Sequence, residues 1–507
     1  MLSILVGHSY FLRFDRKQWK RAKPYPPLAT LQTAASLRRC GHRVAVFDSM
    51  LAGGPEEIDR PLREFAPQLF VLYEDNFNFL SKMCLGRMRE AALRMIAAAR
   101  QAGARVIVGG SDASDAPQAY LEAGAEIVLL GEGLAALAAL VMRLNAQPSS
   151  PVTELATGLS GIVCATSGGS QRPRHAHLPT SPLPPEAPAL DLIDVERYRA
   201  VWQRAHGRFS LNMAASRGCS FRCNWCAKPI WGNQYLQRPA SEVAAEMLQL
   251  KARFHPDHVW FADDIFGFRT DWVEEFTAAL RAGGGGIPFA IQTRADLVSP
   301  RMASALREAG CCEAWIGAES GSQRILDAMD KGTTVAQILA ARERLRAEGV
   351  RVGFFIQLGY LGEQLEDVLA TRHLVETAQP DDVGVSVSYP LPGTKFYEQV
   401  RHQLGATTHW QQSDDLAMMF NGTYQSGFYR AVRDLLHAQV DAARAARVER
   451  ADAPLDAAVA RELRRRWSAL LAAEQCYRNE TDGAPDAAAD RAAGLAPAAA
   501  CLATGMG

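Results

Sequence analysis

Short apolar runs alternate with longer helical segments twice along this chain, and this alternation constrains the fold more than any other feature. Gly41, Gly103 and Gly124 follow helical stretches of the first series, at the place where a left-handed residue is favoured after a helix. Strands that alternate with helices form a parallel sheet covered on both faces. Residues 1–148 therefore predict an α/β domain with a doubly wound, five-stranded parallel sheet. Its strand-like runs are ILVG (4–7), RVAVFD (43–48), LFVLY (69–73), RVIVGG (105–110) and EIVLLGE (126–132).

A second alternation follows over residues 209–395. Ser299 with Pro300, and Thr334, are typical first residues of the helices between its strands. Six successive βα units predict a partial (β/α)6 barrel, with its active site at the carboxyl ends of the strands. The strand-like runs are LNMAAS (211–216), HVWFAD (258–263), PFAIQT (288–293), EAWIGAE (313–319), RVGFFIQ (351–357) and DVGVSVSY (382–389).

The segments around the barrel differ from it in composition. Residues 149–208 contain a stretch rich in Pro, Ser and Gly, which indicates a surface linker. Residues 396–478 read as a helical C-terminal region whose aromatic and Met side chains could cover a substrate or could pack in the core. Residues 479–507 are rich in Ala, Gly, Pro and Asp, and we expect them to be disordered.

Charge and cysteine usage restrict the setting of the protein. The chain has 55 Lys and Arg against 55 Asp and Glu, so no overall charge points to a nucleic-acid partner or to a membrane surface. No apolar run approaches the roughly 18 residues of a membrane span. The first residues lack the features of a signal peptide, and most of the ten cysteines are irregularly spaced. We therefore expect a cytoplasmic protein that has no membrane span and does not bind nucleic acid.

Three of the cysteines gather in RGCSFRCNWC (217–226). Cys219, Cys223 and Cys226 have the spacing Cys-x3-Cys-x2-Cys and follow the first strand of the predicted barrel, where catalytic loops belong. A structural zinc ion needs four ligands, and no fourth Cys or His lies nearby in the sequence. Three thiolates on one loop suit a [4Fe–4S] cluster with one open iron. A zinc site completed from elsewhere in the chain is the alternative.

With Trp225 before its last cysteine, this motif resembles the signature of radical S-adenosylmethionine (SAM) enzymes. The resemblance covers residues 210–395. It implies that SAM binds the open iron of a [4Fe–4S] cluster and is cleaved reductively to a 5′-deoxyadenosyl radical. It also implies a low-potential electron donor such as flavodoxin or ferredoxin.

The same resemblance implies SAM contacts on successive barrel strands. Arg294 could pair with the SAM carboxylate. The family's Gly-Gly-Glu segment is replaced by the pair of Asp263 and Asp264. For two of the residues other roles are open, because Asp263 could cap a helix and Glu319 could form a salt bridge at the barrel floor. The implied SAM contacts are Trp225, Asp263, Asp264, Gln292, Arg294, Glu319, Ser320, Ile356 and Pro390.

The front domain resembles the cobalamin-binding domain of class B radical SAM enzymes. The resemblance rests on YPPLAT (25–30), CGHRVAVFD (40–48), GGSDASDAP (109–117) and GEG (131–133). Glycines in these segments would let backbone N–H groups approach a ligand closely. The implied cobalamin contacts are Pro27, Leu28, Tyr73, Asn76, Gly109, Gly110, Ser111, Gly131, Glu132 and Gly133.

The histidine motif that places a ligand on cobalt is absent from the front domain. His8 follows the first strand, but Val6 and Phe11 stand where that motif has Asp and Gly. We therefore expect no cobalt ligand from this motif, and Asn76 or Phe77 could shield the lower face of the corrinoid. A domain of this shape that no longer binds cobalamin is the alternative.

These resemblances together imply a cobalamin-dependent radical SAM methyltransferase. One SAM would methylate the cobalamin and a second would generate the radical, so that an unactivated carbon, or a phosphorus, of a small-molecule or natural-product substrate receives the methyl group. Position alone suggests Tyr389 and His409 as candidate catalytic residues.

Three other functions are alternatives to this one. The first is a non-methylating oxidative cyclase or rearrangement enzyme, for which the anaerobic magnesium-protoporphyrin monomethyl ester cyclase is the example. The second is a methylthiotransferase. That family carries three more cysteines in its front domain, whereas the front domain here has only Cys40 and Cys84, so this alternative is disfavoured. The third is a zinc-organised interaction module without catalytic activity.

Overall fold

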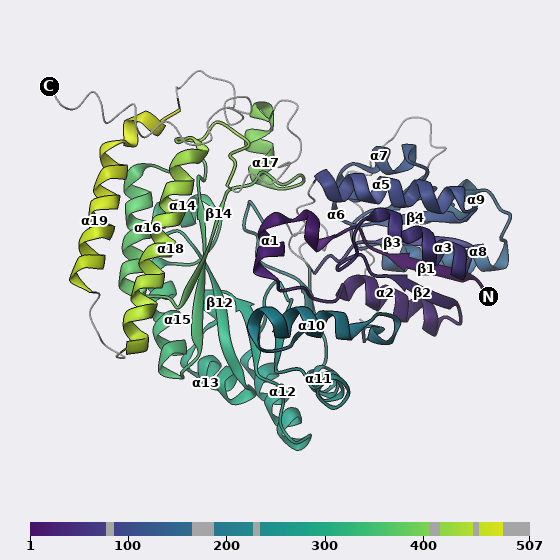
Figure 1. Cartoon of the computed structure of the whole chain (residues 1–507), viewed down its shortest axis with the longest axis horizontal. Helices are drawn as coiled ribbons and strands as arrows, with labels where there is room; N and C mark the ends of the chain where they lie inside the picture. The colour runs from purple at the N-terminus through teal and green to yellow at the C-terminus, as the bar shows by residue number, and fades with distance from the viewer. Residues whose placement is uncertain (78–85, 165–186, 227–233, 405–415, 450–455, 480–507) are drawn as a thin grey trace.

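The computed structural model describes residues 1–77, 86–164, 187–226, 234–404, 416–449 and 456–479. They form two large sheets, each with its own helices, that lie beside each other (Figure 1). None of the helices in these ranges is long and apolar enough to cross a lipid bilayer.

The front sheet has the doubly wound parallel architecture that the sequence predicts. Its strand order is β2-β1-β3-β4-β5-β6, and β1 to β5 run parallel. Every residue of the central strand β3 is buried, because helices cover both faces of the sheet. Its strands are β1 (Ser3–Gly7), β2 (Arg43–Phe47), β3 (Leu69–Tyr73), β4 (Arg105–Gly109), β5 (Ile127–Leu129) and β6 (Ile162–Cys164).

The helices of the front domain lie on the two faces of this sheet. Phe70 and Leu72 join the apolar cluster that includes Met95 of α5, whereas Leu69 and Val71 join the cluster on the opposite face. The helical segments are η1 (Leu12–Phe14), α1 (Arg16–Arg21), α2 (Leu28–Arg39), η2 (Pro55–Ile58), α3 (Asp59–Phe65), α5 (Gly86–Gln101), α6 (Ser111–Asp115), α7 (Pro117–Glu122), α8 (Leu134–Ala146) and α9 (Val152–Ala156).

The segment predicted as a linker is partly ordered. Strand β6 adds a sixth, antiparallel strand beside β5, with Ile127 opposite Cys164. The helix α10 (Val195–His206), preceded by η3 (Leu190–Leu192), joins the two sheets. Its Trp202 indole N–H donates to the Pro24 carbonyl oxygen at 2.7 Å. The Pro-rich residues 165–186 lie outside the described ranges.

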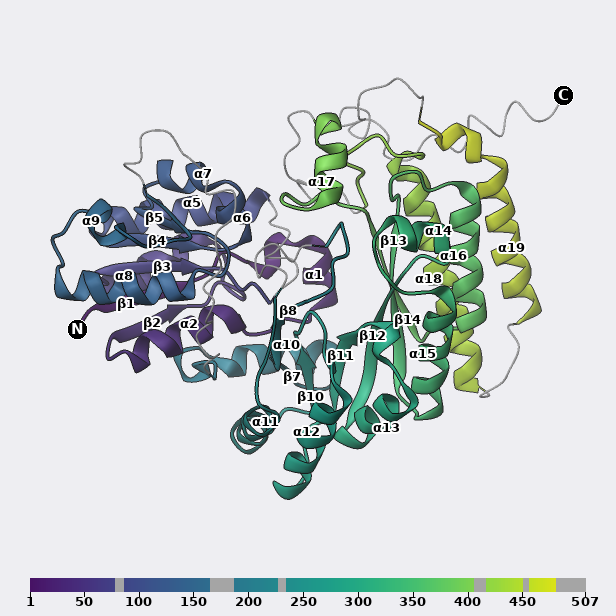
Figure 2. The same ribbon diagram turned by 180° about the vertical axis from the view of Figure 1, so that it is seen from behind.

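The second sheet is the predicted open barrel. Its order is β14-β13-β12-β11-β10-β7, all neighbouring pairs are parallel, and within the described ranges β7 and β14 form free edges. The sheet is curled, and its open side faces the front domain (Figure 2). Its strands are β7 (Ser210–Met213), β10 (His258–Phe261), β11 (Phe289–Thr293), β12 (Cys311–Glu319), β13 (Arg351–Leu358) and β14 (Asp382–Val387).

The helices around this half-barrel begin where the sequence indicates. The Ser299 side chain caps α13, with Pro300 in its first turn, and Thr334 forms a capping box with Gln337 at the start of α15. The helical segments are α11 (Ala240–Phe254), α12 (Thr270–Ala282), η5 (Ala295–Leu297), α13 (Pro300–Ala309), α14 (Gln323–Ala328), α15 (Val335–Ala347) and α16 (Leu365–Ala378).

The C-terminal region is helical and packs on the outside of the half-barrel. The long helix α18 lies against β14 and α16, and α19 lies beside α18 (Figure 1). Residues 480–507, expected to be disordered, lie outside the described ranges. The elements are α17 (Lys395–Val400), η6 (Arg401–Gln403), α18 (Ser426–Glu449), α19 (Ala457–Ala472) and η7 (Glu474–Tyr477).

Candidate functional site

The cysteine loop connects the two strands of a short antiparallel stem at the mouth of the half-barrel. Strands β8 (Ser216–Gly218) and β9 (Tyr235–Gln237) pair antiparallel and bracket the loop. The fully buried carboxylate of Asp263 accepts the Ala215 backbone N–H at 3.0 Å and the Ser216 hydroxyl at 2.5 Å. Burial raises the pKa of Asp263 to about 7. The carboxylate therefore fixes the first strand of the stem, and the cap of the next helix is Arg269 rather than Asp263.

The three cysteines of the motif lie on this loop, and none of them forms a disulfide. Cys219 is buried, and Cys223 and Cys226 are half-buried. Among the described residues, no three His, Cys, Asp or Glu side chains converge closely enough to hold a single metal ion. The cysteines of a [4Fe–4S] cluster each bond a different iron.

Arg294 lies beneath the cysteine loop, where it is 4% exposed. Its guanidinium approaches Cys223 Sγ to 3.6 Å and lies 3.7 Å from the centre of the Phe221 ring. It also donates to both carboxylate oxygens of Asp296, at 2.9 and 3.1 Å, and to the Lys331 carbonyl at 2.8 Å. Arg294 therefore lies within reach of Cys223, and Asp296 balances its charge.

A buried ion pair lies next to this arginine. Lys331 Nζ is 2.7 Å from Glu319 Oε1, which is the salt bridge that sequence reasoning left open for Glu319. It stands at the carboxyl end of β12 rather than at the barrel floor. Burial lowers the pKa of Lys331, but the charges of Glu319 and Cys223 outweigh it, so the pKa is raised overall.

The other predicted SAM contacts follow the carboxyl ends of the strands. The Gln292 amide donates to the Asp263 backbone carbonyl at 2.7 Å, and the buried Ser320 hydroxyl accepts the Ser322 N–H at 3.1 Å. The Trp225 indole N–H is buried, and no hydrogen-bond acceptor meets it in the described part of the chain. Ile356, Pro390 and the candidate Tyr389 are buried, and Asp264 is half-buried. His409 lies outside the described ranges.

Two aromatic residues that sequence reasoning missed face the concave side of the half-barrel. Trp315 and Phe355 stack with their ring centres 4.9 Å apart, and both are half-buried. Gly353 and Gly384 make room for them, since a Cβ on Gly353 would lie 2.6 Å from the Trp315 ring. The signal was present in the sequence, because an aromatic residue and a glycine stand two positions apart in EAWIG (313–317) and in RVGFF (351–355), and so share one face of each strand.

The predicted cobalamin contacts gather at the carboxyl edge of the front sheet. Tyr73 ends β3 and Gly109 ends β4, whereas Gly110 caps α6 and Ser111 opens it. Gly131, Glu132 and Gly133 follow β5, and Pro27 and Leu28 open α2. The Tyr73 hydroxyl donates to the Glu132 carbonyl at 2.6 Å. Asn76 is fully buried at this edge, and within the described ranges no hydrogen-bond partner meets its side-chain oxygen or nitrogen.

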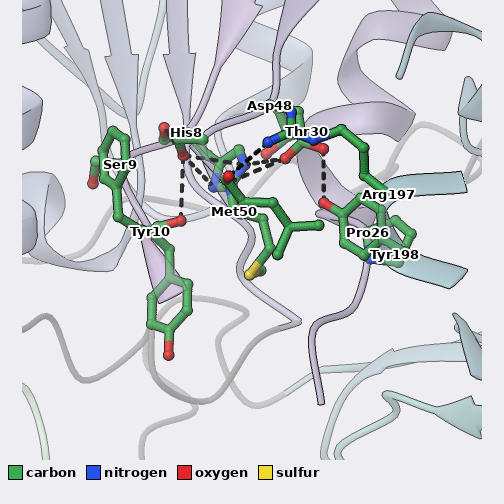
Figure 3. A network of polar contacts seen from close by, with 12 residues as sticks. His8, Ser9, Tyr10, Pro26, Thr30, Asp48, Met50, Arg197 and Tyr198 are labelled. Carbon is green, nitrogen blue, oxygen red and sulfur yellow. Dashed lines mark hydrogen bonds and ion pairs between the residues drawn. The ribbon is translucent and has the colours of Figure 1, made fainter. Parts of the chain in front are cut away.

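His8 lies at the same edge and is engaged with protein groups. Its Nε2 is 3.2 Å from Asp48 Oδ1, and the Ser49 hydroxyl is 3.2 Å from Nδ1 (Figure 3). The Tyr198 hydroxyl of α10 donates to the other Asp48 oxygen at 2.7 Å. His8 is fully buried.

The carboxyl edge of the front sheet (the front edge) directly contacts the stem of the cysteine loop. Arg217, on the stem strand β8, forms an ion pair with Glu132 and donates to Gln32 Oε1 at 2.6 Å. Arg217 and Gln32 are 5% and 3% exposed, so this contact is buried between the two sheets. The two sets of predicted cofactor contacts are therefore neighbours, although they are far apart in the sequence.

Comparison with known proteins agrees with this geometry. Residues 213–375, from the end of β7 into α16, match the radical SAM superfamily, so the chain contains a radical SAM domain, as the cysteine motif predicts. An uncharacterized methyltransferase of Pyrococcus horikoshii is 27% identical over 228 residues, which cover 44% of this chain and 48% of that relative. The anaerobic magnesium-protoporphyrin IX monomethyl ester cyclase of Rubrivivax gelatinosus is 23% identical over 244 residues, covering 48% of this chain and 43% of the cyclase. The chain thus aligns with about half the length of these relatives.

Among solved structures, the radical SAM methyltransferase TsrM of Kitasatospora setae, with cobalamin and a [4Fe–4S] cluster bound, has a similar fold. The TM-score is 0.62 at 18% identity, over 80% of this chain and 79% of TsrM. The shared fold therefore extends well beyond the radical SAM domain.

Proposed function

We propose that this radical SAM enzyme binds a [4Fe–4S] cluster, SAM and cobalamin, and that it methylates an unactivated carbon of a small-molecule or natural-product substrate. The observation that carries the proposal is the buried contact between Arg217 of the cysteine-loop stem and Glu132 of the front edge. It brings the candidate SAM site at the cysteine loop next to the candidate cobalamin site at the carboxyl edge of the front sheet. A reaction that joins a substrate radical to a carried methyl group requires that proximity.

The cysteine loop suits an iron–sulfur cluster in its chemistry as well as in its spacing. The Arg294 guanidinium lies 3.6 Å from Cys223 Sγ and can donate to a thiolate there, while Asp296 and Glu319 balance the charges of Arg294 and Lys331. The unpartnered indole N–H of Trp225 is one further donor that a bound group would satisfy.

The front edge suits a corrinoid. The buried carboxamide of Asn76 lies near the Tyr73 hydroxyl and makes no hydrogen bond of good geometry within the described residues, and the amides of a corrinoid would supply partners. Gly133 has φ of 64°, and a Cβ there would lie 2.6 Å from Leu129, so the loop after β5 is shaped for glycine.

When bound, SAM on the cluster would supply the hydrogen-abstracting radical and the corrinoid would supply the methyl group. The residues of this chain would hold these groups and exclude water. Trp315 and Phe355 offer an apolar surface inside the half-barrel that serves the second task. We also expect a low-potential donor such as flavodoxin or ferredoxin, and a cytoplasmic location.

An anaerobic assay tests the proposal. The protein is reconstituted with iron, sulfide and hydroxocobalamin, then given SAM and a low-potential reductant, and the products are identified by mass spectrometry. Cobalamin-dependent formation of both S-adenosylhomocysteine and 5′-deoxyadenosine is expected. 5′-Deoxyadenosine alone would favour the cyclase-like reaction, which the relative from Rubrivivax gelatinosus also suggests. Absence of both products would contradict the proposal.

A further inference from the structure

Among the described residues, Arg217 directly links the cysteine loop to the candidate cobalamin contacts at the carboxyl edge of the front sheet. It lies on β8, two positions before Cys219, and its side chain leaves the half-barrel to reach Glu132 and Gln32 of the front domain. Its guanidinium also lies 5.8 Å from the centre of the Phe77 ring. One side chain thus meets three separate front-domain segments: the loop after β5, helix α2 and the loop after β3.

Both ends of this link are held firmly. On the barrel side, Asp263 binds the backbone N–H of Ala215 and the hydroxyl of Ser216, so β8 cannot shift without breaking buried hydrogen bonds. On the front side, the Glu132 carbonyl accepts the Tyr73 hydroxyl. A buried charge that loses its partner is strongly destabilised, so a displacement of Glu132 must be followed by Arg217.

We infer that Arg217 couples the two sites, so that filling the front edge with a corrinoid tightens the binding of SAM at the cysteine loop. This inference rests on the proposed function. A corrinoid on the loop of residues 131–133 fixes Glu132 against Arg217, and Arg217 in turn fixes the stem from which the cysteines project. Arg217 is a positioning residue in this account, because it acts through Glu132 and through the stem.

The coupling is measurable without turnover. The dissociation constant of SAM is determined by equilibrium dialysis on protein with a reconstituted cluster, with and without saturating hydroxocobalamin. We expect cobalamin to tighten SAM binding by about tenfold, and SAM to tighten cobalamin binding by the same factor, because coupling between two binding sites is reciprocal.

The variants are designed so that the protein can fold. Arg217→Met alone would leave Glu132 charged and unpaired, so the test uses the double variant Arg217→Met with Glu132→Met, which replaces the buried pair with apolar side chains. The coupling factor should fall below about twofold, from the tenfold expected of the unaltered protein. Arg217→Lys, which keeps the charge, should retain part of it.

A second buried ion pair provides the matched control. Arg238 follows β9 of the same stem and pairs with Glu246 of α11 at 2.7 Å, with both side chains 6% exposed. The described contacts of this pair stay within the barrel. The double variant Arg238→Met with Glu246→Met should therefore keep the coupling factor, even if it lowers stability.

The outcomes separate the two claims. If the protein binds cobalamin but the affinity for SAM changes less than twofold, the inference is wrong and the proposed function stands. If the Arg217 and Glu132 double variant keeps the coupling, the inference is also wrong. If the protein binds no cobalamin at all, both the proposed function and the inference are overturned.

Discussion

Lys331 and Glu319 form a 2.7 Å ion pair whose side chains are 7% and 6% exposed, directly beside Cys223 and Arg294. A Cβ on Gly317 would lie 2.6 Å from Lys331 Nζ, so the glycine makes room for the lysine end. The pair stands at the carboxyl end of β12, where it borders the candidate SAM site.

Removing one partner of this pair should destabilise the protein strongly. Lys331→Met leaves Glu319 charged and buried, and we expect the free energy of unfolding to fall by about 3–5 kcal/mol. Urea denaturation of the cofactor-free protein measures it. The control is Lys395→Met, which breaks an exposed pair with Asp330 and should cost less than about 1 kcal/mol. Equal losses in the two variants would contradict the assignment.

Replacing a cysteine of the loop should abolish cluster assembly. Cys223→Ala removes one of the three cysteines that the cluster would need as ligands. Iron and sulfide analysis after anaerobic reconstitution, with the visible absorption of the cluster, measures the effect. Cys40→Ser, at an exposed free cysteine after α2, should assemble the cluster normally. An intact cluster in the Cys223 variant would show that Cys223 is not a ligand.

The two sheets could be predicted from the sequence because buried parallel strands are continuous apolar runs separated by helices. Strand β6 escaped this reasoning, since it has only three residues and pairs antiparallel with β5, at the end of the series of parallel strands. The Pro-rich segment beside it dominated the composition of that region.

The residues of the site were found more readily than their contacts. The spacing of Cys219, Cys223 and Cys226 identifies the loop without a structure. In contrast, the sequence did not identify the protein partners of Arg294 and Glu319, which are Asp296 and Lys331, and the predicted SAM contacts of both residues stay predictions. The contact between Arg217 and Glu132 joins residues 85 positions apart, and no local pattern predicts such a pair.

Asn76 provides a test with two effects of opposite sign. Asn76→Leu removes an orphaned buried carboxamide, so without cobalamin we expect the free energy of unfolding to rise by about 1–3 kcal/mol. The same change should weaken cobalamin binding, because the corrinoid loses a partner. Denaturant titration and cobalamin dialysis measure the two effects. The exposed Asn145→Leu should change neither, and lower stability with unaltered cobalamin affinity would refute this role.

Glu363 should make stability depend on pH. It is fully buried after β13, and burial raises the pKa of its carboxyl group to about 8. The Gly359 N–H donates to one of its oxygens at 2.7 Å, while the other has no hydrogen-bond partner in the described chain. Asp367 adds to this shift in the pKa and Arg324 opposes it.

The sign of the effect follows from proton binding. Between pH 4.5 and 8 the folded protein keeps a proton on Glu363 that the unfolded chain has lost. Raising the pH through this window therefore lowers the free energy of unfolding, by up to about 1.4 kcal/mol for each pH unit. Glu363→Gln should remove this loss, so the variant gains stability over the unaltered protein as the pH rises to 8 and resembles it near pH 4.5.

Denaturant titrations across this range measure the difference, and Glu366→Gln, at an exposed position on α16, serves as the control. A difference that stays constant with pH would mean that the Glu363 carboxyl is already ionised in the folded protein.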